Sequence, residues 1–442
     1  MNSTVRESYL TGLSLPLSFL FGIYRRTCRV LSEDDEKHWQ CIFRGIDKAG
    51  GKLIIASALI VSPYQPWLTF NLITLFLLFT SMAFFLYVGA VSMYYAQDDL
   101  MTFVEIAHAY TFILAFSILL FIHYAFNLPV AQELFKLLDS GIFEYKTRYC
   151  EEDDSKLRGT MKFFYGIFQN VFRTAILLVV LILAVLAPIL VTFFGGGSRQ
   201  TVKEINYNLP VPLWMPFDMN THLGFWCGYL LVFMEIILIG LYLAAAIPFI
   251  VFVAFEVNTQ YRILKRSILS LEHRALEKYS GYSRVKDPQI EMLRHDPIYA
   301  RCVQDSLKEN VLHHNEILRL FNLYQDVTST LFGVIIGVSM IILASLSIVL
   351  SKINLLSFEA VKFAMMFFIE LIIVFGYCLM GTFLTHGSQE IPSALYNCPW
   401  FNLNESHKRT LRIFQFNSSI SIELRGSGLF LIDLQLFVQV RD

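Results

Sequence analysis

TFNLITLFLLFTSMAFFLYVGAVSMYY, residues 69–95, is the stretch that decides the class of fold. It runs for 27 residues without a single Asp, Glu, Lys or Arg. About 20 apolar residues are enough for a helix to cross the ~30 Å hydrocarbon core of a bilayer. The whole chain agrees with this, because 55% of its 442 residues are hydrophobic and only 16% are charged. The composition excludes an ordinary soluble protein and predicts an integral membrane protein.

Five further apolar runs are long enough to span a bilayer, and we predict an all-α integral membrane protein with a seven-helix bundle. The expected helices cover residues 69–95, 104–128, 173–195, 221–255, 327–351 and 358–385, with a short seventh helix in 429–442. Residues 1–67 are expected to be a cytoplasmic or interfacial segment. Within them LIIASALIVS, residues 53–62, is too short to span and is expected to be interfacial or re-entrant.

The basic residues fix the orientation of the bundle. With a cytoplasmic N-terminus, 30 of the 35 Lys and Arg residues fall in cytoplasmic segments, as the positive-inside rule requires. The mixed charges of residues 256–325, spaced at helical intervals, predict helices that continue on the cytoplasmic side.

Enzyme motifs are missing from the sequence, and we expect neither catalysis nor a cofactor, a metal or a nucleic-acid partner. There is no His-Glu-x-x-His, no nucleophile elbow and no phosphate-binding loop. Glu309, His313 and Glu316 share one helical face at near metal-ligand spacing, but a solvated face is the favoured interpretation and no metal is proposed.

One stretch resembles a known family. FGYCLMGTFLTHGSQEIPSALYNCPW, residues 375–400, is similar to the C-terminal region of insect odorant receptors. LPVPLWMPFD at 209–218 and GSGLFLIDLQLF at 426–437 resemble the second outer loop and the start of the last helix of that family. A G-protein-coupled receptor is excluded by the inverted topology and by the lack of Asp-Arg-Tyr and Asn-Pro-x-x-Tyr motifs.

The resemblance implies an odorant receptor subunit in the plasma membrane, which forms an odorant-gated cation channel as a hetero-tetramer with a co-receptor. It implies that residues 386–428 form a cytoplasmic anchor in which Tyr396, Trp400, Leu411 and Phe414 contact other subunits. Packing of these aromatic and aliphatic side chains within one subunit is the alternative.

The last helix would line the pore, starting at Leu429 and including Asp433 and Leu436. In the family this helix continues for three or four turns beyond the position of Phe437 and carries the gate there. The expectation for the chain as written is therefore a pore-defective or regulatory subunit, or an alternative last exon.

The resemblance also places the ligand pocket between the second and sixth helices, where apolar walls bind small volatiles by shape and dispersion. The candidate ligand residues are Phe112, Leu190, Thr192, Trp226, Tyr229, Phe233, Phe367 and Phe368. Helix packing or lipid contact is the alternative role of each aromatic.

Three polar residues in the expected spans are functional candidates, since an ionisable group within a membrane is costly. Glu235 and Glu370 would either form an acidic site for an amine ligand or line a water-filled vestibule, neutral or paired with a histidine, and we favour the vestibule. His108, like His123, could bond a ligand carbonyl or satisfy a helix partner.

Two other functions remain open at this stage. A secondary transporter could use Glu235 and Glu370 as proton-coupling groups, although no inverted repeat is visible. A gustatory-type receptor shares the topology, but the ALYNCPW stretch, residues 394–400, favours the odorant branch.

The topology makes a prediction about glycosylation. Sequons occur at Asn2, Asn404 and Asn417, and all three are expected in the cytoplasm, where no glycan is attached. The full chain expressed in insect cells should therefore show no mobility shift after treatment with an N-glycosidase. A glycan on any of the three asparagines would overturn the topology.

Overall fold

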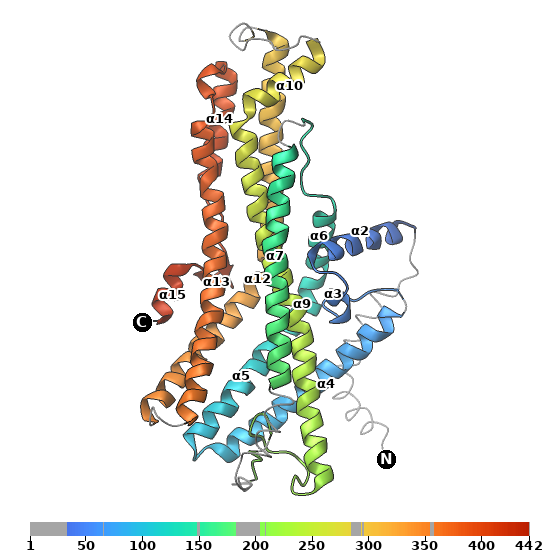
Figure 1. The fold of residues 1–442 in the computed structure, drawn as a ribbon, viewed down its shortest axis with the longest axis vertical. Coiled ribbons are helices and arrows are strands. Elements are labelled where there is room, and N and C mark those ends of the chain that lie inside the picture. Colours follow the sequence, from blue (N-terminus) through green and yellow to red (C-terminus); the bar gives the residue numbers. More distant parts are fainter. Residues whose placement is uncertain are drawn as a thin grey trace, which may run out of the picture. The chain divides into compact units, whose positions relative to one another are not determined.

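The structure is a computed structural model, which describes residues 33–64, 66–147, 151–182, 204–207, 209–283, 293, 296–353 and 358–441. These residues are almost entirely helical (Figure 1). In chain order the elements are α2 (Glu33–Ala49), α3 (Leu53–Ala56), α4 (Trp67–Ala96), α5 (Leu100–Ile122), the π-helix η1 (His123–Asn127), α6 (Leu128–Asp139), α7 (Glu151–Leu181), α9 (His222–Leu269), α10 (Leu271–Ser283), α12 (Pro297–Lys352), α13 (Phe358–Asn397), the 3-10 helix η3 (Trp400–Asn402), α14 (Glu405–Ser418), the strands β1 (Arg425–Gly426) and β2 (Phe430–Leu431), and α15 (Leu434–Arg441).

Among the described residues, six helical stretches are long and apolar enough to cross a membrane. They are Trp67–Ala96, Leu100–Asp139, Asp154–Leu181, His222–Leu269, Pro297–Lys352 and Phe363–Asn397. The expectation of an all-α membrane protein is confirmed, and the short hairpin of β1 and β2 is its one described sheet.

Several helices are much longer than a bilayer requires. Helix α9 has 48 residues and α12 has 56, which at 1.5 Å per residue gives lengths of roughly 70 and 85 Å. The charged stretches 256–269, 271–283 and 297–326 are helical, as the sequence predicts. Helix α7 begins at Glu151, well before residue 173, and the expected residues 183–195 lie outside the described part of the chain.

The chain divides into two compact units. The first comprises Met1–Gln132, Gln169–Phe249 and Val334–Ile373, and the second comprises Glu133–Phe168, Ile250–Gly333 and Val374–Asp442. The candidate ligand residues all belong to the first unit. The candidate anchor and last-helix residues all belong to the second.

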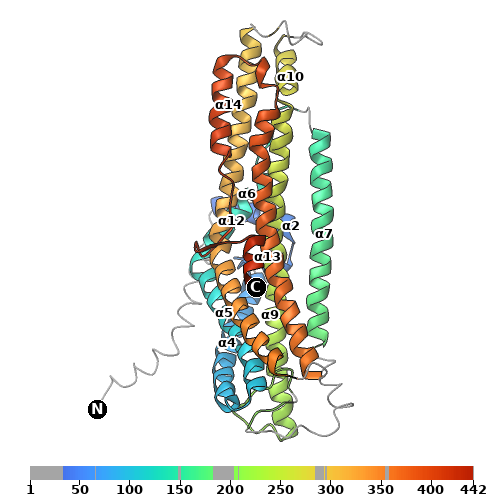
Figure 2. The same cartoon turned by 90° about the vertical axis from the view of Figure 1, so that its left-hand side faces the viewer.

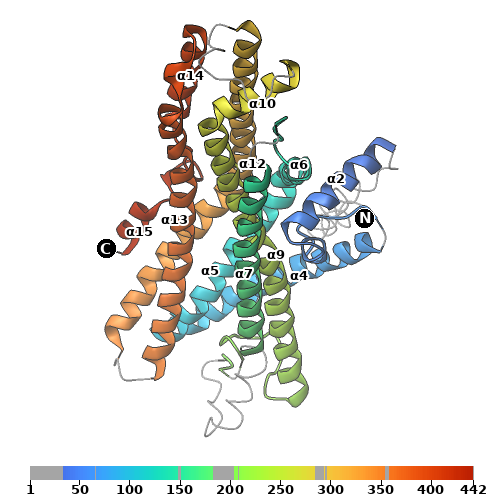
Figure 3. The same cartoon turned by 45° about the horizontal axis from the view of Figure 1, so that its top comes forward.

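In the first unit, α4 and α5 form an antiparallel pair that the turned view shows side by side (Figure 3). The side chain of Asp99 caps the start of α5 by accepting the backbone N–H of Met101 at 3.2 Å. The helices approach closely at Gly89, where an added Cβ would lie 2.8 Å from the ring of Tyr110. The small residue at this position therefore sets the spacing of the pair.

The apolar segment at 53–62, expected to be interfacial or re-entrant, is helical over only its first few residues. Only Leu53–Ala56 is helical, and Ala58, at a φ of 60°, turns the chain out of the helix. Ile60, Val61 and Ser62 are buried without regular structure.

Polar side chains of neighbouring helices satisfy the backbone of this segment. His123 bonds to the carbonyl of Leu59 at 2.9 Å, and the Tyr124 hydroxyl donates to the carbonyl of Ala58. The Asn71 amide oxygen accepts the backbone N–H of Ser62 at 3.1 Å. Irregular backbone can be buried here because these side chains replace the missing helical bonds.

In the second unit, α14 lies beside α12 and α13, as the view turned by 90° shows (Figure 2). Asn404 caps α14 by accepting the backbone N–H of His407 at 3.0 Å. The ring of Phe414 meets that of His314 on α12, with 5.5 Å between the ring centroids. Helix α14 is amphipathic, and the buried apolar residues Leu411 and Phe414 face its own chain.

The last helix begins later than the sequence predicts. Ser427 and Gly428 have φ angles of 50° and 70°, which make a tight primed turn between β1 and β2. Leu429 ends this turn and is not the start of a helix. Helix α15 starts at Leu434, and Asp433 is its cap, accepting the backbone N–H of Leu436 at 2.9 Å.

Gly381 of α13 lies against the chain just after β2, where there is no room for a side chain. A Cβ on Gly381 would lie 1.8 Å from the carbonyl oxygen of Ile432, so only glycine fits. The Thr382 hydroxyl next to it accepts the backbone N–H of Leu434 at 3.0 Å.

We predict that Gly381→Ala destabilises the protein by about 1–3 kcal/mol, because overpacking forces the backbone of 430–434 away from α13. Gly376→Ala on the same helix is the matched control, since its Cβ would meet nothing within 4 Å and alanine favours a helix by up to ~1 kcal/mol. Thermal unfolding followed by fluorescence-detected gel filtration compares them. Equal melting temperatures for the two variants would refute the close packing.

Candidate functional site

Tyr229 is the most buried of the described candidate ligand residues, with 8% of its surface exposed. It belongs to a cluster of buried side chains from α4, α5, α9 and the loop before α9, which we call the α4–α9 cluster. Its members are Phe85, Val88, Ala96, Ile106, Ile205, Leu209, Leu213, Met215, Tyr229 and Val232.

The loop before α9 is fixed on this cluster by polar contacts. The backbone N–H of Trp214 donates to the Ser92 hydroxyl at 2.8 Å, and that of Asn206 donates to the carbonyl of Leu213 at 3.1 Å. The loop that resembles the second outer loop of odorant receptors therefore packs into the α4–α9 cluster, to which it contributes Leu209, Leu213 and Met215.

Other candidate ligand residues lie elsewhere in the first unit. Phe112 and Trp226 are 42% and 55% exposed, and Phe233 is partly buried. Phe112 stacks on Phe116 with 6.4 Å between the ring centroids, and Phe116 in turn meets the ring of Tyr242.

Phe367 and Phe368 occupy different surroundings although they are neighbours. Phe367 packs against a second buried cluster that includes Val104 and Phe363, whereas Phe368 is 62% exposed. Leu190 and Thr192 lie outside the described residues. The described candidates therefore do not form one group, and Tyr229 alone of them is in the α4–α9 cluster.

The two intramembrane acids have different partners. Glu370 accepts a hydrogen bond from Ser339 of α12. Its partner is therefore a serine and not a histidine. Glu235 is 4% exposed, and neither of its carboxyl oxygens has a hydrogen-bond partner among the described residues. Ser81 of α4 is close to Glu235, but its hydroxyl donates to the carbonyl of Leu78 at 3.1 Å.

The histidines of α5 and η1 also differ. His123 is buried and bonds to the carbonyl of Leu59 at 2.9 Å, so it satisfies a partner within the protein. His108 is half-buried on α5. Of the two, His108 alone stays a candidate for ligand contact.

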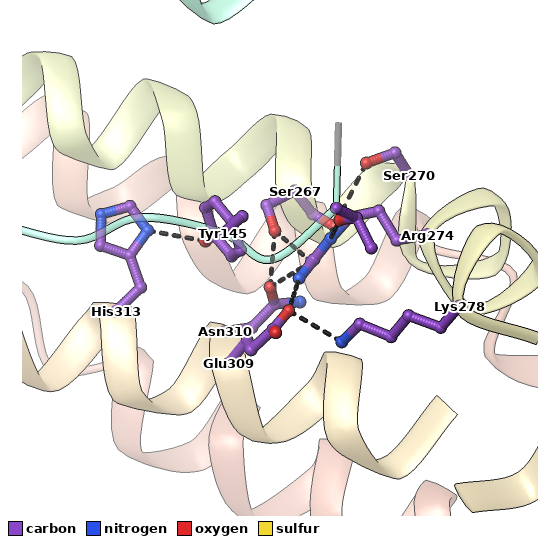
Figure 4. Close-up of polar contacts among 9 residues, drawn as sticks. Tyr145, Ser267, Ser270, Arg274, Lys278, Glu309, Asn310 and His313 are labelled. Carbon is purple, nitrogen blue, oxygen red and sulfur yellow. Dashed lines mark hydrogen bonds and ion pairs between the residues drawn. The ribbon is translucent and has the colours of Figure 1, made fainter. Parts of the chain in front are cut away.

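The second unit contains a buried polar cluster around Arg274 (Figure 4). Arg274 is 2% exposed and donates to Glu309, to the Asn310 amide oxygen at 2.7 Å and to the Ser267 hydroxyl. Lys278 approaches Glu309 at 2.9 Å. A buried arginine is tolerable here because a carboxylate and several oxygens meet its guanidinium group.

A chain of polar contacts, which begins with a cation–π contact, continues from this cluster along α9. The Arg274 guanidinium lies 4.3 Å from the ring centre of Tyr145, whose hydroxyl is 2.6 Å from Nδ1 of His313. His313 Nε2 lies 2.9 Å from Oε1 of Gln260, and the Gln260 amide donates to Glu256 at 2.7 Å.

These contacts determine where the protons are. Burial raises the pKa of Tyr145, so its hydroxyl is protonated and donates to His313 Nδ1. The Gln260 amide oxygen accepts, so Nε2 of His313 carries the ring proton. His313 is thereby held as the neutral imidazole.

The expectation of a solvated face for Glu309, His313 and Glu316 is wrong for the first two. Glu309 is 8% exposed and His313 is fully buried, because α10 and the loop with Tyr145 cover this face of α12. Glu316 pairs with Arg319 at 3.6 Å. The described residues hold no group of three or more His, Cys, Asp or Glu that could bind a metal.

The four candidate anchor residues separate into two pairs. Tyr396 and Trp400 are 67% and 42% exposed, whereas Leu411 and Phe414 are 6% and 4% exposed in the packing of their own chain. Leu411 and Phe414 therefore pack within their own subunit, which is the alternative to a contact between subunits. Tyr396 and Trp400 stay available for a contact with another subunit.

The sequence model of the family described as 7tm Odorant receptor matches residues 99–441, which is most of the chain. The chain belongs to this family. Odorant receptor 33a of Drosophila melanogaster is 23% identical over 197 residues, 41% of this chain and 51% of that protein. Odorant receptor 33b of the same fly is 21% identical over 337 residues, 72% of this chain and 74% of that protein. This odorant receptor thus spans about half the length of the first relative and about three quarters of the second.

Solved structures of the insect olfactory receptor OR5 from Machilis hrabei have the same fold as this odorant receptor. One matches with a TM-score of 0.61 at 12% identity, over 88% of this chain and 93% of that one. The second, in complex with eugenol, matches with a TM-score of 0.63 at 13% identity, over 91% and 94%. The resemblance inferred from residues 375–400 is confirmed, and the family is one of receptors.

The polar cluster around Arg274 is the feature of this odorant receptor that sequence reasoning missed. Glu309 and His313 are visible as a pair at i and i+4, but the sequence does not show that Tyr145 and Arg274, far away along the chain, lie against them. A signal was present in the small residues Ser267 and Ser270, which leave room for a large side chain.

We predict that Glu309→Gln lowers the stability of the receptor by about 3–5 kcal/mol, because it leaves the charge of Arg274 buried without a carboxylate. Glu423→Gln is the control, since it removes the partner of the exposed Arg425 and should cost less than about 1 kcal/mol. Melting temperatures of the purified full-length receptors measure both effects.

A double variant, Arg274→Met with Glu309→Leu, tests whether the unpaired charge of Arg274 causes the loss of stability. Replacing both charges with apolar side chains should restore most of the stability that Glu309→Gln loses, because no unpaired charge is left buried. A melting temperature of Glu309→Gln that equals that of Glu423→Gln would contradict the buried pair.

Proposed function

We propose that this chain is the ligand-recognising subunit of an odorant-gated cation channel, which assembles with a co-receptor in the plasma membrane of olfactory neurons. The observation that carries the proposal is the match of the odorant receptor family over residues 99–441. The ligand is a small volatile, and the N-terminus is cytoplasmic.

The first unit supports the part of the proposal that concerns the ligand. The α4–α9 cluster contributes apolar side chains together with the phenol of Tyr229, and a loop fixed by backbone hydrogen bonds covers it. Such surroundings recognise a ligand through shape and dispersion, with few directional bonds. The related receptor from Machilis hrabei has been solved with eugenol, a small aromatic volatile.

The second unit supports the part that concerns assembly. Tyr396 and Trp400 are exposed near the end of α13 and in η3, and exposed aromatic side chains are enriched in protein interfaces. We propose both as contacts with another subunit.

Expression in oocytes together with an insect odorant co-receptor tests the function. The expected result is an inward cation current evoked by members of a volatile panel of alcohols, esters and phenols, which includes eugenol. The co-receptor expressed alone is the control for ligand specificity. Surface-expressed receptor that gives no volatile-evoked current and binds no volatile of the panel would refute the function.

A second variant tests the assembly contact. Trp400→Ala should lower the yield of the receptor co-purified with the tagged co-receptor while leaving its melting temperature within a few degrees, because Trp400 is 42% exposed. Leu411→Ala is the contrasting variant, since it truncates a buried side chain and should lower the melting temperature. Unchanged co-purification of Trp400→Ala would remove this residue from the interface.

A further inference from the structure

We propose that Glu235 is the group with which this receptor recognises amines, so that volatile primary amines are its favoured ligand class. The inference rests on the proposed function and goes beyond it by naming the chemistry of the ligand. It depends on the burial of Glu235, on its lack of a partner and on its place beside the α4–α9 cluster.

The state of Glu235 is unusual for a carboxyl group. The side chain is 4% exposed, and both of its oxygens lack a hydrogen-bond partner among the described residues. A charged carboxylate in apolar surroundings is very unfavourable, and even the neutral acid loses the hydrogen bonds that it makes with water. A ligand that donates hydrogen bonds to these oxygens removes this penalty, so the protein favours such a ligand.

The surroundings of Glu235 suit an amine with an apolar tail. On α9, Glu235 is one turn after Val232, and on α4, Ser81 is one turn before Phe85. Val232 and Phe85 are members of the α4–α9 cluster. A ligand whose tail lies among the side chains of this cluster would thus bring its polar end to Glu235.

An amine satisfies this carboxyl group better than an alcohol of the same size. A neutral amine enters the apolar site, and its nitrogen lone pair takes the proton of the Glu235 acid, so that one O–H bond breaks and one N–H bond forms. The resulting ammonium donates charge-assisted hydrogen bonds to the carboxylate, which are stronger than neutral ones. An alcohol carries one weaker donor, and an ester or an ether carries none.

Glu370 provides an internal comparison. It is also an acid in an apolar helix of the first unit, but it accepts a hydrogen bond from Ser339 and is only partly buried. One carboxyl oxygen of Glu370 thus has a hydrogen-bond donor without a ligand. Glu235 also has a serine nearby, Ser81, but its carboxyl oxygens accept no hydrogen bond among the described residues, and the amine is therefore assigned to Glu235.

The test compares matched pairs of ligands on the full-length receptor co-expressed with the co-receptor. The probes are hexylamine against hexan-1-ol and benzylamine against benzyl alcohol, with eugenol and hexyl acetate as neutral ligands. We expect half-maximal amine concentrations that are about 10- to 100-fold lower than those of the paired alcohols, the range given by a hydrogen bond to a charged group. Glu235→Gln should abolish this preference, whereas Glu370→Gln should keep it.

The neutral ligands separate the possible failures. If Glu235→Gln responds to eugenol or hexyl acetate as the wild type does and loses only the amine preference, the proposal is supported. If the wild type responds to neutral volatiles but shows no amine preference, or if Glu235→Gln keeps that preference, the proposal is wrong and the proposed function stands. If no probe of either kind evokes a current or binds, the proposed function itself fails.

Glu235→Gln could fold poorly for unrelated reasons, and Glu235→Asp covers that case. Aspartate keeps the carboxyl group but places it one methylene further from the ligand. The Glu235→Asp receptor should therefore prefer amines over alcohols less strongly than the wild type does. Where Glu235→Gln does not reach the surface, a Glu235→Asp receptor that does, that responds to neutral volatiles and that has no amine preference left would overturn the role of the carboxyl group.

Discussion

Each backbone N–H and C=O group inside a bilayer must be bonded within the protein, and the rest of this structure depends on that constraint. The six apolar stretches satisfy it as helices. Where the chain leaves helical geometry in an apolar environment, as at residues 57–62, side chains replace the lost bonds. The contacts of His123 and Asn71 with this segment are therefore structural, although both residues lie in helices expected to cross the membrane.

The constraint explains what could be predicted from the sequence. The helices of the apolar runs were predictable because a helix that crosses the bilayer must be long and nearly free of charge. Both properties can be read from a single sequence. The starts of α7 and α15 were not predictable. Nothing in the residues just before 173 breaks a helix, so α7 begins in charged sequence at Glu151. The late start of α15 follows from a turn at Ser427 and Gly428, and apolarity alone does not reveal such a turn.

The candidate site was predictable only as a list of residue types. A helix that is apolar on all sides does not indicate which side faces its neighbours, so Tyr229 and Trp226 could not be told apart from the sequence. In the structure one is buried in the α4–α9 cluster and the other is 55% exposed. Leu411 and Phe414 were grouped with Tyr396 and Trp400 by the resemblance to the family, and a resemblance does not show that α14 turns the first two toward its own chain.

Buried polar groups in the two units show two different solutions to one physical problem. In the second unit the charge of Arg274 is met by Glu309 and by neighbouring oxygens, and the hydrogen bonds around His313 are complete. The pairing of Arg274 with Glu309 favours one arrangement of the helices, because any shift leaves a charge unpaired. In the first unit the carboxyl group of Glu235 is also buried, and neither of its oxygens has a hydrogen-bond partner among the described residues. The buried charge of Arg274 is thus paired in one unit, whereas this acid has no hydrogen-bond partner in the described part of the unit that we expect to bind the ligand. The unmet hydrogen bonds of Glu235 therefore point to a ligand that supplies the donors.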